Sequence, residues 1–518
     1  MPIVNVPLQR KIEEILAVLA EKDEKNTTLV TKAYRFGEEA HKEQKRYSGD
    51  PYFSHLAEVG YELALMGMDS ATVAAGFLHD TIEDANVSAK TLETEFGVEV
   101  RALVEGVTKL GTVRYHGLER HTESLRKFFA ATATDLRVLI IKLVDRLHNV
   151  RTLTHVPPHK RKRIALETLE IYAPIADRLG MSVIKTELED AAFPFAYQEN
   201  YEKTRQLLKE RSSETEKRLE KTAKDLKREL ATLGMRNFRT ESRKKGVYSL
   251  FRKLERKNWD MAQIHDILAL RVIVPTVADC YSALGAIHGE WHPVPGKIKD
   301  YIAFPKPNGY QSIHTTIYTG DGGTLEIQIR TEAMHREAQF GIASHLGYKE
   351  TLGYTKGGLE WVRQFLPIRR KTSESAERLR IKMKDPVAAA HNVPQWVKDL
   401  AFAHQAADES EEYLDTLKAD FFSHRVFVFT PKSDVIDLPL NATPIDFAYQ
   451  IHSDLGNHMA GARVNGKMVA LDTPLKNGDL VEVIVKQSAR PSHKWADIAK
   501  TTLAKKHIRT ALAAQPKR

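Results

Sequence analysis

The chain has 518 residues, of which 42% are hydrophobic and 28% are charged, an ordinary composition for a soluble globular protein. This length allows roughly three or four domains, each with its own core. The net charge of +9 favours anionic partners such as nucleotides or RNA, and the single cysteine, Cys280, excludes internal disulfides and any multi-cysteine zinc site.

The N-terminus begins with a short apolar run but lacks the cationic start and long apolar core of a signal peptide. The sequence has no stretch of about twenty apolar residues, so it predicts no transmembrane helix. We therefore expect a cytoplasmic protein without a membrane partner.

Residues 1 to about 195 carry apolar residues at three- and four-residue spacing, which predicts helices throughout. Polar groups interrupt this background at three places: His55, the adjacent pair His79 and Asp80, and Asp145. Two histidines and two carboxylates form a mixed nitrogen and oxygen ligand set that suits a divalent transition ion such as manganese or iron.

Glu83 and Asp84 follow the His-Asp pair by about one helical turn, a position from which carboxylates can orient a metal-bound water and move its proton. The alternative is structural: Asp145 pairs with a neighbour such as Arg146, and His79 is a hydrogen-bonded core histidine. The order H…HD…D over ninety residues favours the metal site.

From about residue 196 to 237 the chain is strongly charged, with leucines at wide spacing among lysines and glutamates. This pattern predicts one or two solvated helices that connect domains. Residues 238–350 then contain short strand-like runs between helical segments, which predicts an α+β domain.

Asp266 and Glu326 each adjoin a strand-like run of this domain, and carboxylates from two strands can hold Mg²⁺ together with phosphates. Three clustered cations are expected to reach a polyphosphate: Arg243, Lys245 and Lys253. A metal-held pyrophosphate and a positioned hydroxyl are what phosphoryl transfer requires.

The stretch KIKDYIAFPKPNGYQSIHTT, residues 297–316, combines three lysines with aromatic side chains. Its lysines supply point charges for phosphates, and Tyr310 offers a face on which a base can stack, worth about 1–3 kcal/mol per base. The alternative is a basic surface hairpin, because Pro-Asn-Gly is a common turn signal.

Several sequence motifs before residue 195 resemble the HD-type hydrolase half of the long RelA/SpoT homologues: RYSGDPYFSHLAEV, AAGFLHDTIEDANV, VEGVTKL and IKLVDRLHNVRTL. Enzymes of that family make and destroy the alarmone (p)ppGpp. The resemblance implies that His55, His79, Asp80 and Asp145 hold Mn²⁺, that Glu83 and Asp84 activate water, that Arg46 lies against guanine, and that Asn149 contacts the nucleotide.

A second group of sequence motifs resembles the synthetase half of the same family: RKKGVYSLFRK, HDILALRVIV, KIKDYIAFPKPNGYQSIHTT and LEIQIRTEAMHREAQFGIASH. The resemblance implies a nucleotidyltransferase-like fold that moves pyrophosphate from ATP to the 3′-hydroxyl of GDP or GTP and releases AMP. It further implies that Asp266 and Glu326 bind Mg²⁺ and act in catalysis, that Arg243, Lys245, Lys253 and Arg271 hold phosphates, that Tyr310 stacks on guanine, and that Lys306, Asn308 and His314 line that pocket. The basic motif that contains Lys297 and Lys299 is similar to the motif found at this place in the bifunctional members of the family.

The alternating strands and Asn-Gly turns of residues 424–486 predict a compact β-rich module, which resembles the TGS domain. In that domain the histidine that matches His452 can contact the end of a tRNA; the alternative is a solvent-facing loop histidine. The expected protein is therefore multidomain: an all-α HD-type hydrolase domain (1–195), charged connecting helices (196–237), an α+β nucleotidyltransferase-like synthetase domain (238–350), a helical linker region (351–422), a β-grasp TGS domain (423–487) and a basic helical tail (488–518).

The expected partners are ATP, GDP or GTP, (p)ppGpp and, through the TGS domain, the ribosome and tRNA. Two other hypotheses stay open. In one, a single half is active, because Tyr47 and Leu346 depart from the family pattern. In the other, the chain is a tRNA- or ribosome-binding regulator with relic enzyme domains. We also expect that the two halves communicate through residues 196–237.

Overall fold

The structure is a computed structural model that describes residues 12–19, 24–111, 135–232, 234–261, 264, 268–306, 308–321, 323–346, 425–431, 435–476 and 478–513. The chain divides into two compact units, Met1–His404 and Gln405–Arg518. The predicted linker region at 351–422 and the predicted ligand Asp266 lie outside the described residues.

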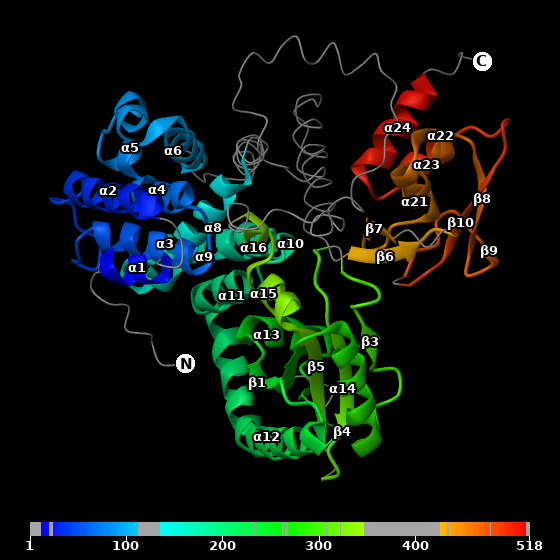
Figure 1. Cartoon of the computed structure of the whole chain (residues 1–518). Coiled ribbons are helices and arrows are strands. Elements are labelled where there is room, and N and C mark those ends of the chain that lie inside the picture. The colour runs from blue at the N-terminus through cyan, green and yellow to red at the C-terminus, as the bar shows by residue number, and fades with distance from the viewer. Residues whose placement is uncertain are drawn as a thin grey trace. The chain divides into compact units, whose positions relative to one another are not determined.

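The first unit begins with helices only, as the apolar spacing predicts. They are α1 (Ile12–Leu19), α2 (Glu24–Ala40), α3 (Phe53–Leu65), α4 (Ser70–Leu78), α5 (Thr81–Asp84), α6 (Ala89–Gly111), α8 (Leu136–Arg151), the 3₁₀ turn η1 (Leu153–His155), α9 (Pro158–Glu167), the π-helical turn η2 (Thr168–Tyr172), α10 (Ala173–Arg178) and α11 (Ser182–Ala196). Helix α4 packs against α2, α3 and α6, while α8 packs against α3 and α11 (Figure 1). Both α4 and α8 are largely buried, because apolar residues occupy almost every face of each helix.

A charged cluster fixes where α4 and α8 begin. The Asp69 carboxylate accepts from the Thr72 backbone N–H and caps α4, and the Asp135 carboxylate accepts from the Arg137 backbone N–H and caps α8. The buried Arg137 guanidinium pairs with both carboxylates, at 3.1 Å from Asp69 and 2.7 Å from Asp135. The two helix starts are thereby tied together.

The second part of this unit contains a sheet of five described strands in the order β1-β2-β5-β4-β3 (Figure 1). Its elements are α12 (Gln198–Thr232), β1 (Arg239–Lys244), α13 (Val247–Arg256), β2 (Leu268–Val274), α14 (Val277–Glu290), β3 (Lys299–Asp300), β4 (Ile313–Tyr318), β5 (Thr324–Thr331), α15 (Glu332–Phe340) and α16 (Ala343–Leu346). β2 and β5 pair in parallel and the other neighbours pair antiparallel, so the sheet is mixed, as expected of an α+β domain.

One face of the sheet forms the core of this part, because residues in a strand alternate between faces. Leu270, Val272, Ile327 and Ile329 from β2 and β5 belong to a buried cluster that also includes residues of α12, α13 and α14. The opposite face carries polar side chains. The side chains that are candidates for nucleotide binding, described below, therefore lie on the polar face of the sheet.

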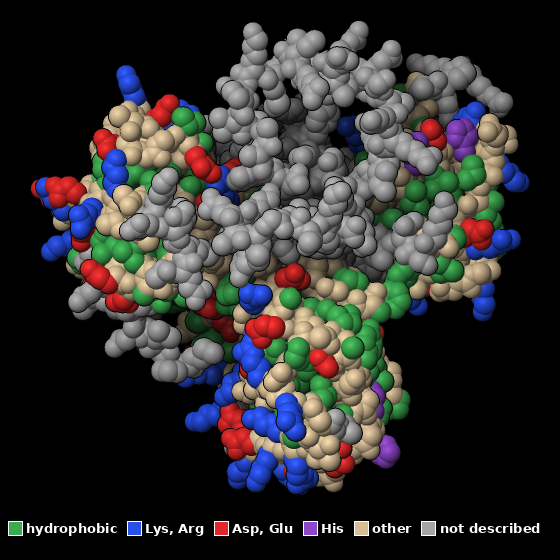
Figure 2. Space-filling view, viewed as in Figure 1, with side chains coloured by type: hydrophobic (Ala, Val, Ile, Leu, Met, Phe, Trp, Pro, Cys, Tyr) green, Lys and Arg blue, Asp and Glu red, His purple; other side chains and the backbone are tan. Residues whose placement is uncertain are grey.

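Helix α12 differs from its prediction. It is one continuous helix, and Leu219, Leu226 and Leu230 are buried in the core of the sheet part. Its outer surface carries lysines, arginines and glutamates, which Figure 2 shows as a mixed blue and red surface at the lower end of the view. The expectation of a solvated connector is therefore wrong for the inner face, because the widely spaced leucines form a narrow apolar stripe that is buried.

The second unit is β-rich, as predicted. It contains β6 (Arg425–Phe429), β7 (Val435–Pro439), α21 (Pro444–Ile451), α22 (Ser453–Asn457), β8 (Met459–Val464), β9 (Lys467–Val469), β10 (Val481–Val485), α23 (His493–Ile498) and α24 (Thr502–Ala513). The described strands form a three-stranded sheet, β10-β8-β9, and a two-stranded sheet, β6-β7, which a parallel bridge between Phe429 and Leu480 connects. The predicted helical tail packs onto this core through Ala504 and Ile508 of α24.

None of the described helices combines the length and the apolar character that crossing a membrane demands.

Candidate metal centre and nucleotide site

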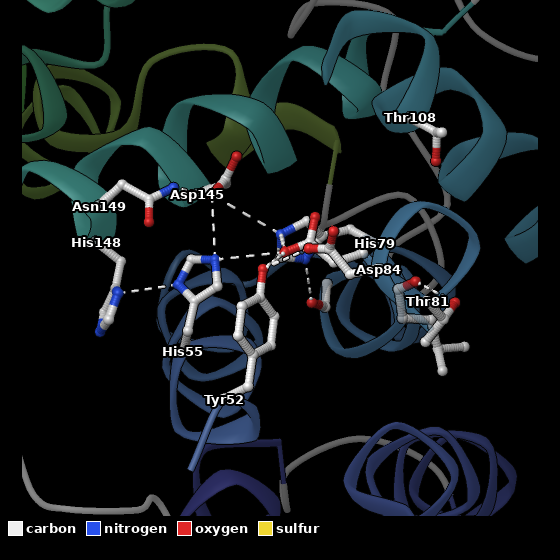
Figure 3. Close-up of polar contacts among 12 residues, drawn as sticks. Tyr52, His55, His79, Thr81, Asp84, Thr108, Asp145, His148 and Asn149 are labelled. Carbon is white, nitrogen blue, oxygen red and sulfur yellow. Dashed lines mark hydrogen bonds and ion pairs between the residues drawn. The ribbon is translucent and has the colours of Figure 1, made fainter. Parts of the chain in front are cut away.

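Four side chains predicted as metal ligands lie together between α3, α4, α5 and α8 (Figure 3). His55 Nε2 lies 3.1 Å from Asp145 Oδ1 and 3.9 Å from Asp80 Oδ2. His79 Nε2 lies 3.3 Å from Asp80 Oδ2 and 3.8 Å from Asp145 Oδ1. Residues ninety positions apart in the sequence thus point two nitrogens and two oxygens at one small volume.

Close packing of α3 and α4 brings the two histidines together. Gly60 on α3 has no side chain where the Phe77 ring of α4 packs, and a Cβ at Gly60 would lie 2.1 Å from that ring. His55 stands in the first turn of α3, and His79 directly follows the last residue of α4. A larger residue at position 60 would therefore separate the helices that carry them.

Hydrogen bonds at the far nitrogens orient both imidazoles. His79 Nδ1 lies 2.8 Å from the Gly76 carbonyl oxygen, to which it must donate. His55 Nδ1 lies 2.9 Å from His148 Nδ1, which also lies 2.8 Å from the Arg46 guanidinium. With the Nδ1 protons used in this way, both Nε2 lone pairs face the centre, which is the arrangement that metal-binding histidines adopt.

The donor set fits a divalent metal ion. His79 Nε2 is buried, has no hydrogen-bond partner and faces the carboxylates of Asp80 and Asp145, so the site favours a cation beside this nitrogen. One ligand atom each from His55, His79 and Asp80 lie within 4.8 Å of one another, which is close enough to hold one ion. A mixed nitrogen and oxygen set of this kind suits first-row divalent metals.

The electrostatics of the site also favour a cation. Burial lowers the pKa of His79, but the carboxylates of Asp80 and Asp145 outweigh it and raise that pKa to about 10. Burial disfavours ionisation of the two carboxyls, yet His79 beside Asp80 and Lys142 beside Asp145 lower the pKa of each below its usual value. Both carboxylates are therefore ionised at neutral pH.

The two predicted water-activating carboxylates lie at the rim of this centre. Glu83 and Asp84 belong to the short helix α5, which starts directly after Asp80, and both are exposed. The Tyr52 hydroxyl lies 2.8 Å from Asp84 Oδ2 and 2.9 Å from Asp80 Oδ2, so it can donate to either (Figure 3). Although the Glu83 side chain reaches solvent, partial desolvation by the surrounding protein raises its pKa, and the charge of Lys142 opposes that rise.

Arg46 and Asn149, the predicted nucleotide contacts, bond to each other beside the centre. The Arg46 guanidinium donates to Asn149 Oδ1 at 2.8 Å, and the Asn149 amide donates to Asp145 Oδ1 at 2.6 Å. A group that contacts Arg46 is thereby linked through two hydrogen bonds to Asp145, a predicted metal ligand.

Sequence reasoning missed three residues of this site: Tyr52, Lys142 and His148. Lys142 donates to Asp145 Oδ2 at 2.6 Å. Lys142 and His148 stand three residues before and after Asp145 on α8, so helical spacing places them on its face and was a usable signal. Tyr52 lies outside α3, and nothing in its spacing indicates that it bridges two carboxylates.

The second candidate site lies on the polar face of the sheet. Glu326 on β5 and His314 on β4 are ion-pair neighbours, with His314 Nδ1 3.3 Å from Glu326 Oε1. His314 Nε2 lies 2.8 Å from the Tyr310 hydroxyl, and the Gln328 amide donates to Glu326 Oε1 at 2.7 Å. Three predicted residues therefore form one connected polar chain.

Aromatic rings and a lysine surround Tyr310. The Lys306 ammonium lies 5.0 Å from the Tyr310 ring centre and 4.7 Å from that of Tyr301, which is within cation–π range. Burial lowers the pKa of Lys306. Tyr301 also contacts the His314 ring edge-on at 5.3 Å, and sequence reasoning did not single it out. The Asn308 amide donates to the Asp177 carbonyl oxygen at 3.1 Å.

The predicted phosphate-binding cations line the polar face and its rim. Arg271 on β2 is half-buried and Arg243 on β1 is exposed, while Lys245 after β1 and Lys253 on α13 are half-buried. Burial and the charges of Arg330 and Arg243 lower the pKa of Arg271 to about 10. The side chains of Lys297 and Lys299 are exposed, and β3 pairs Lys299 with His314.

His452, the predicted RNA contact of the second unit, precedes α22. Its Nδ1 accepts from the Asp454 backbone N–H at 3.1 Å, and 66% of its side chain is exposed. The structure gives this histidine a local capping role, and its exposed edge stays available to solvent.

Three family models match the chain in the predicted order. Residues 33–182 match the model described as HD domain, residues 242–352 match the region found in RelA / SpoT proteins, and residues 426–485 match the TGS domain. The predicted succession of an HD-type, a synthetase-type and a TGS domain is thereby confirmed, and so is the predicted fold class. An HD domain implies dependence on a divalent metal.

Curated relatives match almost the whole chain. The guanosine-3′,5′-bis(diphosphate) 3′-pyrophosphohydrolase of Aquifex aeolicus is 42% identical over 99% of this chain and 68% of its own length. The GTP pyrophosphokinase of Myxococcus xanthus is 42% identical over 93% of this chain and 60% of its own length, and that of Streptomyces coelicolor is 42% identical over 97% and 58%. The chain therefore spans about three fifths to two thirds of the length of these relatives.

Proposed function

This chain belongs to the RelA/SpoT family, and we propose that it is a bifunctional alarmone enzyme that both synthesises and hydrolyses (p)ppGpp. The convergence of His55, His79, Asp80 and Asp145 on one volume, where the buried His79 Nε2 has no hydrogen-bond partner, carries the proposal for the first half. The connected chain of Tyr310, His314 and Glu326 supports it for the second.

In the hydrolase half, His55, His79, Asp80 and Asp145 hold Mn²⁺. A bound divalent ion of this kind lowers the pKa of its water and polarises the phosphoryl oxygens. Glu83 or Asp84 accepts the proton of the attacking water, and the Tyr52 hydroxyl keeps the Asp84 carboxylate in place for that task. The products are GDP or GTP and pyrophosphate.

Arg46 and Asn149 orient the guanosine nucleotide in this half. The guanidinium of Arg46 has a planar face suited to guanine, while its N–H groups are already held by Asn149 and His148. Because these bonds fix the arginine before substrate binds, little side-chain freedom is lost on binding.

In the synthetase half, Asp266 and Glu326 hold Mg²⁺, which shields the charge of the donor phosphates. Tyr310 stacks on the guanine of GDP or GTP, and Lys306, Asn308 and His314 line that pocket. Arg243, Lys245, Lys253 and Arg271, with Lys297 and Lys299 at the rim, neutralise the phosphates of ATP and of the acceptor. Glu326 accepts the proton of the acceptor 3′-hydroxyl as its oxygen attacks the β-phosphorus of ATP, the bond from the β-phosphorus to the α-phosphate oxygen breaks, and AMP leaves.

The second unit contributes recognition of RNA. The exposed His452 and the lysines of α24 make this unit a binding site for tRNA on the ribosome. Such binding is electrostatic in large part, so its affinity falls steeply as the salt concentration rises.

The proposal is tested with the unaltered chain in two reactions. Incubation with ATP, GDP and Mg²⁺ is expected to yield ppGpp and AMP, and incubation of ppGpp with Mn²⁺ is expected to yield GDP and pyrophosphate. Absence of both products overturns the proposal. Salt-sensitive tRNA binding without either product would instead support the hypothesis of a regulator with relic enzyme domains.

A further inference from the structure

An arginine that the proposed mechanism does not use is buried on the polar face of the sheet. Arg330 stands on β5, four residues after Glu326 and therefore on the same face, and only 2% of it is exposed. Its Nε and Nη2 atoms are buried and have no hydrogen-bond partner. Among the described residues, no carboxylate oxygen lies within 4.0 Å of its guanidinium.

A second guanidinium with a buried, unpaired nitrogen, that of Arg271, lies on the strand next to that of Arg330. Arg271 occupies the neighbouring strand β2, and its Nε is also buried without a hydrogen-bond partner. Its ion-pair neighbour is Glu241, at 3.8 Å, but the Glu241 carboxylate also accepts from Arg239 at 2.8 Å. Burial, Arg243 and the guanidinium of Arg330 make the charged form of Arg271 less favourable and lower its pKa to about 10.

Further unsatisfied polar atoms surround the pair. His335 Nδ1 on α15 and Gln328 Oε1 on β5 are buried without hydrogen-bond partners. Native interiors contain few such atoms, and a cluster of them on one face indicates a missing partner molecule. The missing partner is anionic, since the cluster holds two guanidinium groups, of which Arg330 has no ion pair within the described part of the chain and Arg271 shares the Glu241 carboxylate with Arg239.

The surroundings identify the kind of anion. Arg243, a proposed phosphate ligand, lies on β1 two residues from the strand partner of Arg271, and Tyr310, the proposed guanine platform, is linked through His314 to Glu326 on the strand that carries Arg330. The side chain of Arg271 is 20% exposed, so a ligand can approach the pair from that side. A phosphate chain placed between a base platform and a row of arginines meets these conditions.

We propose that Arg330 is a substrate-binding residue of the synthetase half, and that it forms with Arg271 the buried floor of a subsite for a nucleotide phosphate chain. The assignment depends on the proposed function, because it presumes that nucleotides bind this face. The proposal also explains why Arg330 is buried in a strand with no described carboxylate partner, because a buried arginine with a purely structural role would need such a partner.

The test is Arg330→Met, with Arg228→Met as a control that removes one positive charge from the exposed surface of α12. Affinities for GDP and for a non-hydrolysable ATP analogue with Mg²⁺ are measured by calorimetry, and the melting temperature is measured without nucleotide. Arg330→Met is expected to weaken one of the two affinities about 10- to 100-fold, as expected for loss of charge-assisted hydrogen bonds. Its melting temperature without nucleotide is expected to be unchanged or higher, because an uncompensated buried charge is gone.

The two nucleotides distinguish the source of the phosphate chain. Weaker binding of the ATP analogue assigns the subsite to the donor nucleotide, and weaker binding of GDP assigns it to the acceptor nucleotide. Arg330→Lys, which keeps the charge but not the forked donors, is expected to fold and to bind the same nucleotide more weakly than the unaltered chain. If Arg330→Met does not fold, or melts at a lower temperature, and Arg330→Lys binds both nucleotides as the unaltered chain does, the residue is structural and the inference is overturned. Binding of neither nucleotide by the unaltered chain overturns the proposed function itself, and the inference with it.

Discussion

Asn308 donates a side-chain hydrogen bond to the backbone carbonyl of Asp177, 3.1 Å away, and so connects the proposed guanine pocket directly to the helical hydrolase half. Gly180, three residues after Asp177, also lies against the loop that carries Asn308. The Asn308 carbonyl oxygen is 2.9 Å from the position that a Cβ at Gly180 would take. A backbone–backbone hydrogen bond also runs from the Ile342 N–H to the Leu179 carbonyl at 3.0 Å. Communication through residues 196–237 remains a prediction, and these bonds form a second physical connection between the two halves.

Gly180→Ala tests this connection. Gly180 has φ +74°, and an added methyl group would press on the loop that carries Asn308. We expect the KM for GDP in synthesis to rise severalfold. Gly97→Ala is the matched control, because Gly97 has φ +86° and open space around it. Equal kinetic effects of both substitutions would show that backbone strain, and not contact with the pocket, is responsible.

Metal removal should affect the stability and the activity of the hydrolase half together. Mn²⁺ that binds only the folded chain stabilises it, by about 2.7 kcal/mol at a hundred times the dissociation constant. We expect chelation to abolish ppGpp hydrolysis and to lower the melting temperature, and added Mn²⁺ to restore both. The restoration in melting temperature should be lost in His79→Ala; its persistence there would place the stabilising ion elsewhere.

Tyr52→Phe should slow hydrolysis without affecting synthesis. The substitution removes only the hydroxyl that lies between Asp80 and Asp84, and a hydrogen bond to a charged group contributes about 1.5–3 kcal/mol. We expect the rate of ppGpp hydrolysis to fall roughly tenfold, with the synthetase rate of the same preparation as the internal control. A parallel loss of both rates would indicate misfolding.

Glu189 on α11 should make stability depend on pH. Burial outweighs the neighbouring Lys185 and raises the pKa of Glu189 from 4.5 to about 7 in the folded chain, so the folded state favours the protonated form. Its contribution to the free energy of unfolding is therefore fully present below about pH 4.5 and is lost as the pH rises toward 7. A shift of this size corresponds to at most about 3 kcal/mol at 1.36 kcal/mol per pKa unit.

Glu189→Gln replaces the carboxylate by a neutral group that can still accept from Ser249 Oγ, which lies 3.1 Å away. We expect urea unfolding to show a smaller loss of stability between pH 5 and pH 8 in this variant than in the unaltered chain. An unchanged pH dependence would mean that Glu189 is not the group responsible.

The candidate metal centre was largely predictable from sequence because its predicted ligands are strongly polar residues in apolar helices, where a lone charge is costly. Their roles as ligands remain predictions, but His55, His79, Asp80 and Asp145 do converge. The hydrogen bonds that orient them were harder to predict. Tyr52 looks like any loop tyrosine until the fold places two carboxylates beside its hydroxyl.

The sheet part was predictable in its strand pattern and less so in its packing. Alternation along LEIQIRT places Arg330 on the polar face with Glu326, but its burial follows from the packing of α15 beside β2 and β5, which sequence periodicity does not locate. Helix α12 was misread for a related reason, since three leucines in a charged helix bury a stripe only if a partner surface exists.

We propose that one chain carries two separate active sites for the same guanosine nucleotide, one for synthesis and one for hydrolysis. The most direct measurement compares the rates of ppGpp synthesis and ppGpp hydrolysis in Asp80→Ala and in Glu326→Gln. We predict that Asp80→Ala loses hydrolysis and keeps synthesis, and that Glu326→Gln loses synthesis and keeps hydrolysis. Loss of both activities in either folded variant, or of neither activity in both, would contradict the claim.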